Sequence, residues 1–461
     1  MTAVIPKHPT NTGPGTLVRG LGLREATALN MIDMVGIGPF VTMALVIDIM
    51  NGPQCIIAWV IGAFLAVLDG MVWSELGAKW PEAGGSYVFL RKLYGENTWG
   101  RMFSFLFIWQ TVIQAPLVIA SGAIGFAEHF AYLIPVSTFE RRLVSGALVL
   151  LLTFTLYRKI TTAGKISVVL WTVLILTILW ILFAGITHFD SHLPFDYPPG
   201  AWTLSPIFFV ALGQAMGKSV YSFLGYYNVC HLGAEIENPQ RNIPRSMFLS
   251  IAGIAIVYLG MQMSILGTLP WQTARHSPFV FSSFFENIYG VGAANFATVL
   301  ILIIAAASLF SAMLGYSRIP YAAAVNGAFF KVFAKVHETK HFPNVSLLVL
   351  GGLAFVFSVF FNRMGDVISA ILAMRILIQF IGQTVGLILW HRERKNVESL
   401  PYRMPLFPLP AILSIAIWLF VFYFTGLPFV IGASIVIAIG LVVFMLRARQ
   451  QKEWPFEIRA T

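Results

Sequence analysis

Charged residues are scarce in this chain of 461 residues. Asp, Glu, Lys and Arg make up only 11% of the sequence, whereas 57% of it is hydrophobic. A soluble core of this size cannot hide so much apolar surface, so the composition excludes an ordinary soluble protein. A bilayer offers no water to unpaired backbone groups, and the long apolar runs therefore indicate spanning helices rather than a barrel. We expect an all-α polytopic membrane protein.

Cysteine is scarce as well. The two cysteines, Cys55 and Cys230, lie in or beside apolar runs, which argues against a disulfide framework and against a C-x-x-C metal or redox site. No nucleophile with its base and orienting acid, and no cluster of metal ligands, can be assembled from the sequence. We therefore expect neither an enzyme nor a bound metal or cofactor.

The net charge of +10 indicates membrane topology rather than nucleic-acid binding. If the N-terminus lies inside, the outside loops receive only Arg141, Arg142, Arg275 and Arg363, and nearly all other basic residues lie on the cytoplasmic side. The positive-inside rule then places both termini in the cytoplasm. We expect a multi-pass protein of the plasma or inner membrane, with a small-molecule substrate and the lipid bilayer as partners. The sequence leaves the oligomeric state open.

Apolar runs of about 18 or more residues predict about twelve spans. They lie near residues 26–50, 53–77, 101–132, 143–157, 163–187, 204–234, 247–269, 295–324, 344–362, 364–390, 409–426 and 428–446. We expect a cytoplasmic tail over residues 1–25, five spans over 26–187, five more over 202–390, two over 409–446, and a cytoplasmic tail over 447–461. The outside loop over 270–295 is rich in aromatics, and it is either a lid or an anchor at the membrane interface.

Two of the predicted spans contain helix-breaking sequences. Gly36-Ile37-Gly38-Pro39 interrupts the first span, because glycine and proline both disfavour continuous helix. The second break lies in the sixth span, over Ser222–Asn228. If the chain consists of two inverted five-span repeats, the two breaks face each other and form a binding site. Freed amides there attract anions and freed carbonyls attract cations; the alternative is that the glycines only allow close helix packing.

Five ordered motifs resemble those of the amino acid–polyamine–organocation permeases. The family's G-[ST]-G-I-F core is similar to Gly36–Phe40, and its P-x-[AS]-G-G-x-Y-x-[YF] signature to Pro81–Phe89. Its E-x-x-N-P-x-[RK]-x-[IL]-P motif resembles Glu235–Pro244, its S-R-x-x-Y-A element Ser317–Ala322, and its P-Y-[RK]-x-P loop Pro401–Pro405. The order of the five motifs over nearly the whole chain makes this resemblance specific.

The resemblance implies a LeuT-like fold of two inverted five-helix repeats plus two C-terminal helices, and transport by alternating access. It also implies which residues bind substrate. Amides near Gly36, Ile37 and Gly38 would receive a carboxylate, carbonyls near Ser222, Phe223 and Leu224, next to Gly225, would receive an ammonium, and Tyr226 would close over the substrate as an aromatic gate.

The sequence departs from the family pattern at the first break. Ile37 replaces a hydroxyl residue and Pro39 has no N–H, so fewer donors remain for a carboxylate. Gly38–Phe40 also resembles the G-G-P-F core of plant polyamine carriers in the same family. We therefore expect an amino acid as the substrate, with a polyamine or other cationic amine as the alternative. A transport-dead nutrient sensor is less favoured, because no further domain is evident.

Four charged residues fall at membrane depth, where each is costly and thus a functional candidate. Asp33, one turn before Gly36, is the leading candidate for proton coupling, and a fixed ion pair or helix cap is its alternative role. Lys218 is a second coupling candidate or a side chain that snorkels outward. We expect Asp69 and Arg375 to pair with each other.

A few uncharged polar residues also lie within spans. Ser308 and Ser311 share one helix face and could bind sodium, or they could simply pack helices together. Gln110 and Gln114 are polar positions in the third span. Some family members carry a coupling lysine in the fifth span, but here Lys165 falls at the start of that span. We expect a proton as the coupling ion, or an exchange mechanism, with sodium as the alternative.

Overall fold

The computed structural model describes residues 19–157, 163–338, 342–393 and 400–456, and only the backbone of residues 163–171. The side chain of Lys165 lies outside the described residues, as do residues 1–18 and 457–461 of the predicted tails. Apart from two isolated β-bridges, the described secondary structure is helical, and the all-α prediction is confirmed.

Each predicted span coincides with a helix or a broken helix. The first five correspond to α1 (Leu23–Met34) with α2 (Gly38–Met50), α3 (Ile56–Lys79), α5 (Gly100–Leu133), α6 (Thr138–Leu156) and α7 (Ala163–Thr187). The next five correspond to α8 (Pro206–Phe223) with α9 (Asn228–His231), α10 (Pro239–Leu266), α13 (Val291–Tyr316), α15 (Asn344–Phe360), and α16 (Met364–Arg375) with α17 (Gln383–Glu393). The last two are α18 (Leu409–Phe424) and α19 (Leu427–Gln451).

Shorter helices connect these long ones. They are α4 (Ser86–Leu93), α11 (Trp271–Ala274), α12 (Val280–Tyr289) and α14 (Arg318–Val325), together with 3-10 or π segments over Pro53–Cys55, Gly95–Trp99, Leu193–Phe195, Gly233–Glu235, Lys331–Ala334 and Ile376–Gly382. By length and apolar composition, six described helices can cross a bilayer, and a seventh is added if α1 and α2, bent by 51°, form one span. The number twelve and the inverted repeat remain predictions.

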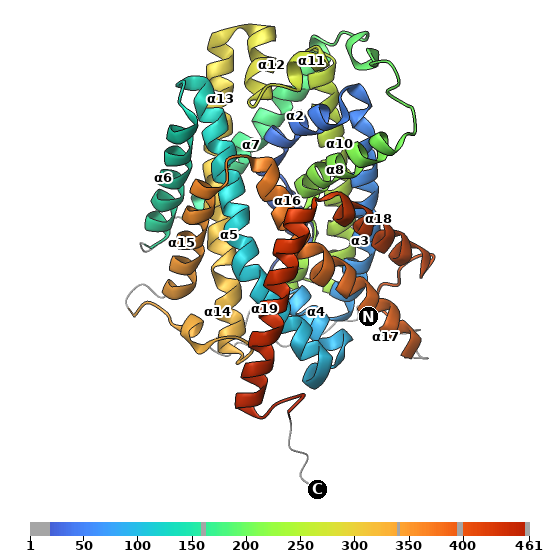
Figure 1. Ribbon diagram of the computed structural model, residues 1–461, viewed down its shortest axis with the longest axis vertical. Helices are drawn as coiled ribbons and strands as arrows, with labels where there is room; N and C mark the ends of the chain where they lie inside the picture. The colour runs from blue at the N-terminus through green and yellow to red at the C-terminus, as the bar shows by residue number, and fades with distance from the viewer. Residues whose placement is uncertain (1–18, 158–162, 339–341, 394–399, 457–461) are drawn as a thin grey trace, which may run out of the picture.

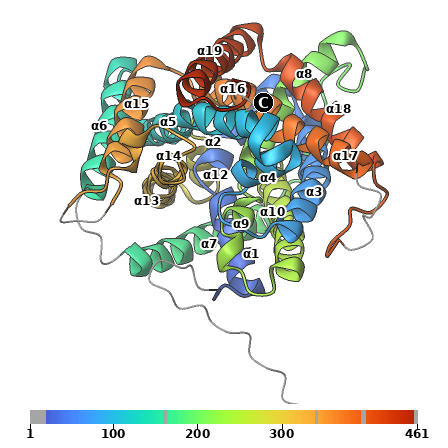
Figure 2. The ribbon, with the colours of Figure 1, turned by 90° about the horizontal axis from the view of Figure 1, so that it is seen from below.

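The long helices run along the molecule, so that it has two distinct ends (Figure 1). We call the end with α11 and α12 the lid end, and the opposite end, where α19 finishes, the termini end. Seen from below, α6 and α15 lie on one flank and α17 and α18 on the opposite flank (Figure 2). Between the flanks, α2 packs against α8, and α1 packs against α9 and α10. The two broken helices thus lie next to each other.

The aromatic loop at the lid end folds into the protein. On α12, Phe281, Phe284 and Phe285 are fully buried, and the Phe281 ring meets Phe40 of α2 edge-on with centroids 5.2 Å apart. Side chains that anchor at a membrane interface would face outward, so this packing favours the lid interpretation of the loop.

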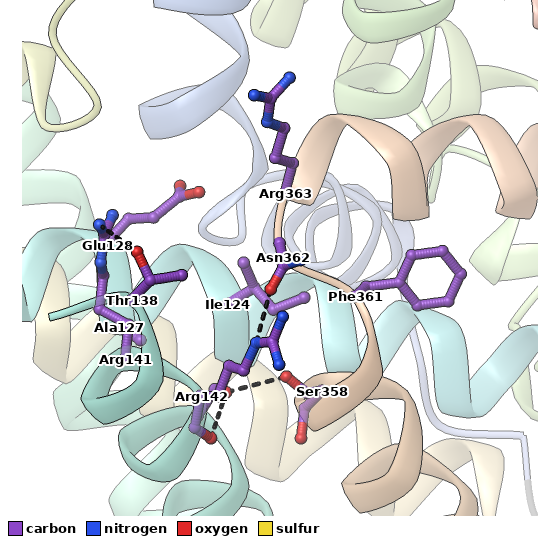
Figure 3. A pocket seen from close by; sticks show the side chains of 11 residues that line it. Ile124, Ala127, Glu128, Thr138, Arg141, Arg142, Ser358, Phe361, Asn362 and Arg363 are labelled. Carbon is purple, nitrogen blue, oxygen red and sulfur yellow. Dashed lines mark hydrogen bonds between the residues drawn. The ribbon is translucent and has the colours of Figure 1, made fainter.

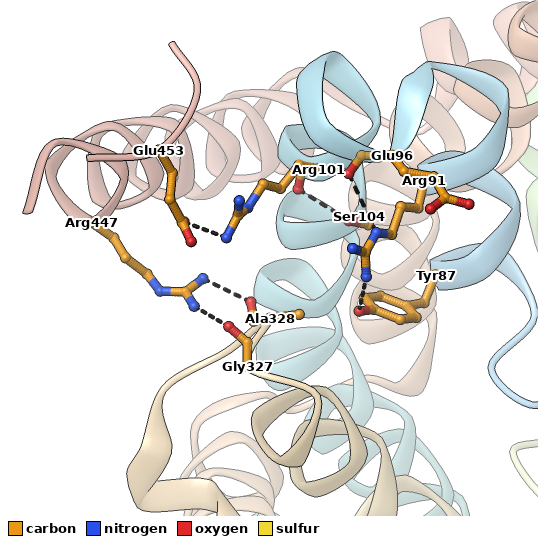
Figure 4. A network of polar contacts seen from close by, with 9 residues as sticks. All are labelled: Tyr87, Arg91, Glu96, Arg101, Ser104, Gly327, Ala328, Arg447 and Glu453. Carbon is orange, nitrogen blue, oxygen red and sulfur yellow. Dashed lines mark hydrogen bonds and ion pairs between the residues drawn. The ribbon is translucent and has the colours of Figure 1, made fainter. Parts of the chain in front are cut away.

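At the termini end, arginines join segments that are distant in sequence (Figure 4). Arg447 of α19 donates to the carbonyls of Gly327 and Ala328, which follow α14. Arg101, at the start of α5, forms an ion pair with Glu453. These contacts fix the C-terminal end of α19 against α5 and the segment after α14.

Candidate functional site

The first helix break lies between Met34 and Gly38. Pro39 occupies the first turn of α2, where its missing N–H has no helical acceptor to satisfy and costs little. The first N–H groups of α2 likewise have no partner within the helix. A Cβ on Gly36 would lie 2.7 Å from Ser308 Oγ, so glycine at this position allows α13 to approach the break closely. The predicted break is confirmed.

The second break separates α8, which ends at Phe223, from α9, which begins at Asn228. Gly225 between them has φ +123°, a value that glycine adopts easily and other residues rarely do. A Cβ on Gly225 would lie 2.9 Å from Asp33 C and 2.9 Å from Met34 N. The two breaks are therefore in direct backbone contact, which confirms that they face each other.

Polar side chains hold the two breaks together. The Tyr258 hydroxyl from α10 lies 2.8 Å from the Met34 carbonyl oxygen and 3.1 Å from the Ser222 carbonyl oxygen. Thr42 and Ser222 join their hydroxyls across 2.7 Å, and the Val229 amide donates to Asn30 Oδ1 over 2.9 Å. Tyr258, Thr42 and Asn30 were not predicted from the sequence; a polar side chain in an apolar run was the available signal.

A cavity of about 120 Å³ lies between the breaks. Its lining brings together many of the predicted site residues, namely Asp33, Gly36, Ile37, Gly38, Ser222, Leu224, Gly225, Ser308 and Ser311. Tyr221, Tyr227, Tyr316 and Arg375 complete its polar lining, although none of them was assigned to the site from the sequence. The cavity therefore carries one carboxylate and one guanidinium.

The cavity is open on one side only. Among its lining residues Asp33 and Ser311 are exposed, whereas Ile37 is buried. Ser311 lies near the end of α13 that is remote from the lid, and Phe40, on the lid side of Ile37, is fully buried against Phe281. The cavity thus communicates with the termini end and is closed toward the lid end.

Several predicted site residues lie outside this cavity. Phe223, Gln110 and Gln114 are buried but do not line it. Lys218 donates to the Gly365 carbonyl over 2.5 Å and to Ser369 Oγ over 2.8 Å, which links α8 to α16. In the described part of the chain, no three His, Cys, Asp or Glu side chains gather to hold a metal ion.

Tyr226, the predicted aromatic gate, also points away from the cavity. Its hydroxyl donates to Asp69 Oδ2 over 2.5 Å, and Trp418 Nε1 donates to Asp69 Oδ1 over 3.3 Å. The neighbouring Tyr227 lines the cavity instead. In this conformation Tyr226 thus connects the second break to α3 and α18.

The expected pair of Asp69 and Arg375 is wrong. The Asp69 carboxylate is occupied by Tyr226 and Trp418, and both of these residues are described in full. Arg375 Nε instead donates to Gln379 Oε1 over 2.8 Å, and its guanidinium lies over the Tyr227 ring at 5.3 Å from the centroid. Two residues that lie mid-span can still point in different directions. Here the side chains of Asp69 and Arg375 contact different partners.

A second cavity, of about 420 Å³, lies toward the lid end among α5, α6, α15 and the start of α16 (Figure 3). Its lining includes Arg141, Arg142 and Arg363, three of the four basic residues predicted for the outside loops, together with Glu128. Arg142 donates to Asn362 Oδ1 over 2.6 Å. None of the helix-break residues lines this cavity, so it is separate from the site between the breaks.

Comparison with known proteins identifies the family of this chain. A family model described as amino acid permease matches residues 21–446. The chain is 25% identical to the aspartate-proton symporter of Bacillus subtilis over 364 residues, which covers 74% of this chain and 67% of that protein.

Two further relatives extend over more of the sequence. The chain is 25% identical to the Asc-type amino acid transporter 1 of Mus musculus over 449 residues, covering 93% of this chain and 81% of that protein. It is 23% identical to the methylthioribose transporter of Bacillus subtilis over 485 residues, covering 98% of this chain and 99% of that protein. The match of the family model to nearly the whole sequence means that this chain belongs to the amino acid permease family.

Proposed function

We propose that this protein is a secondary transporter that carries an amino acid across a membrane by alternating access. The observation that carries the proposal is the cavity between the two broken helices, which is lined by the start of α2 and by the carboxylate of Asp33. Because one relative is named for methylthioribose, membership of the family leaves the solute open. The cavity of about 120 Å³ is similar in size to cavities that hold a small organic molecule, which favours a small amino acid.

The closed lid and the open termini end correspond to one state of an alternating-access cycle. The charge bias of the loops supports a cytoplasmic location for both termini, so the cavity is proposed to face the cytoplasm in this conformation. The opposite state requires the lid helix α12 to leave α2. We propose that the membrane is the plasma or inner membrane.

Asp33 is the proposed coupling group. It lines the cavity, is exposed to it, and touches Gly225 of the second break through its backbone. Gain or loss of a proton there would change the charge at the point where the two breaks meet. Sodium bound by Ser308 and Ser311 is the alternative, since both residues line the same cavity.

Uptake into proteoliposomes tests this proposal. Radiolabelled L-aspartate, L-serine, L-leucine and putrescine would be offered separately, with and without an inward proton gradient, and in sodium or choline medium. We expect at least one amino acid to accumulate when the proton gradient is present, or to exchange for the same amino acid preloaded inside.

Other outcomes would count against the proposal. Uptake of putrescine alone would favour the polyamine alternative, which rests on the resemblance of Gly38–Phe40 to the core of polyamine carriers. Saturable amino acid binding without uptake or exchange would favour a sensor. Accumulation that requires sodium and ignores the proton gradient would remove Asp33 from the coupling role and favour the serine pair.

A further inference from the structure

Arg375 is a buried charge that lines the cavity between the breaks and takes no part in the proposed coupling by Asp33. Its side chain is only 6% exposed, and a charge at membrane depth costs several kcal/mol unless it is balanced. It is the last residue of α16, directly before the π-helical turn over Ile376–Gly382. Such wide turns occur frequently at functional sites.

The surroundings of Arg375 orient the guanidinium without neutralising it. Gln379 accepts from Nε over 2.8 Å, and the rings of Tyr227 and Phe380 lie 5.3 Å and 5.8 Å from the guanidinium carbon. Among the described side chains, no carboxylate forms an ion pair with Arg375. Asp33 lines the same cavity, and the two opposite charges attract each other across it without direct ion-pair contact. The Tyr227 and Tyr316 hydroxyls also lie within reach of the guanidinium. Uncharged neighbours thus hold the two Nη groups beside the cavity.

The start of α2, where a carboxylate is expected to bind, has few hydrogen-bond donors. Ile37 offers no hydroxyl and Pro39 no N–H, so fewer groups remain at the start of α2 than the family pattern provides. A guanidinium binds a carboxylate through two parallel N–H donors, which is stronger than neutral hydrogen bonds. The guanidinium of Arg375 therefore offers the hydrogen-bond donors for a carboxylate that the start of α2 lacks.

We infer that Arg375 is the substrate-binding residue for the carboxylate of the solute, with Asp33 facing its ammonium. This inference rests on the proposed function, and it narrows the substrate to zwitterionic amino acids and excludes amines without a carboxylate. One negative and one positive group in the cavity match the opposite charges of an amino acid. A cationic amine would bring a second positive charge next to a poorly solvated guanidinium, which is costly.

Competition by matched pairs of compounds tests the inference on the unaltered protein. Uptake of the labelled amino acid that is transported best would be measured in the presence of unlabelled competitors. Inhibition by L-leucine would be compared with inhibition by 3-methylbutylamine, and inhibition by L-serine with inhibition by ethanolamine. The second compound of each pair differs only by the lost carboxylate. We expect the amines to compete on the order of 10- to 100-fold less well, which is the usual value of a charge-assisted hydrogen bond. Equal competition within both pairs would overturn the inference without any variant.

Arg375→Gln and Arg375→Lys provide the second measurement. We expect Arg375→Gln to raise the KM for the amino acid about tenfold or more and to abolish the discrimination against the amines, with Arg375→Lys intermediate. The matched control is Arg275→Gln, because the Arg275 guanidinium pairs with Asp48 at the lid end. This variant should still discriminate against the amines. Each variant would be checked for thermal stability in detergent.

The failure of this inference and the failure of the proposed function give different results. If the unaltered protein takes up no amino acid, the proposed function fails. If it takes up an amino acid while Arg375→Gln retains both KM and discrimination, only the role of Arg375 is overturned. If Arg375→Gln does not fold, the competition of the matched pairs against the unaltered protein decides alone.

Discussion

At the scale of single residues, Asp33 lies where the two breaks touch and is exposed at the open side of the cavity. We predict that Asp33→Asn binds and exchanges the amino acid but no longer accumulates it against a gradient when protons flow inward. The asparagine amide keeps an oxygen that accepts a hydrogen bond from an ammonium, but unlike a carboxyl group it does not gain or lose a proton near neutral pH. Uptake as a function of imposed pH gradient measures the effect.

The matched control is Asp196→Asn, which removes a carboxylate from the exposed lid-end segment and should leave the proton-driven uptake unchanged. Accumulation by Asp33→Asn that still follows the gradient would assign coupling to another group.

Gly225 is the residue at which the breaks touch. We predict that Gly225→Ala lowers the free energy of unfolding by about 2 kcal/mol or more, because the new Cβ would require both an unfavourable φ and a displacement of backbone. Thermal unfolding in detergent measures the loss. Gly352→Ala is the control, since a Cβ there meets nothing within 4 Å, and equal melting of the two variants would contradict this account.

Individual residues also mark how far sequence reasoning reached. Glycine and proline have unusual backbone preferences, so Gly36, Gly38 and Gly225 were placed correctly from composition and spacing. Arg375 and Tyr226 were misplaced, because the direction of a side chain depends on its neighbours in space. Asp69 was available to Tyr226 only through the packing of α3 beside the second break, and no spacing in the sequence encodes that contact.

At the scale of elements, the closed side of the cavity depends on α12. Phe281 is fully buried against Phe40, and its removal should weaken the contact of α12 with α2 by about 3 to 5 kcal/mol. We predict that Phe281→Ala opens the lid more often. A cysteine introduced at Val41, which is buried beside Phe40, should then react faster with a maleimide added from the lid side.

The two native cysteines give little background in this experiment, because Cys55 and Cys230 are both buried. Phe64→Ala on α3 is the control, since that residue is 50% exposed and lies on a helix outside the lid. An unchanged rate at residue 41 in Phe281→Ala would mean that α12 is held by other contacts.

The long helices were predictable as elements, whereas their interruptions were only partly so. Apolar runs and flanking charges locate a spanning helix from local sequence alone. The π turn after Arg375 and the separation of α14 from α13 at Ser317 carry no comparable signal. Whether the aromatic loop was a lid or an interface anchor also depended on tertiary packing, and both alternatives were compatible with its composition.

At the scale of the whole molecule, the site opens toward one end only. We predict that a cysteine replacing Ser311 is labelled by a membrane-impermeant maleimide from the termini side and not from the lid side, and that bound amino acid slows the reaction. Ala297→Cys on the same helix is the control, because that position is fully buried. Labelling of residue 311 from the lid side alone would reverse the proposed orientation of this state.

The position of Tyr258 has a consequence for the rate at which such a molecule changes state. A hydroxyl has one hydrogen, and two carbonyl oxygens, one at the end of each half-helix, lie within its reach. When the half-helices shift, the hydrogen can turn from one oxygen to the other by a rotation about a single bond. Such a movement needs no intermediate in which both carbonyl oxygens lose their hydrogen-bond donor.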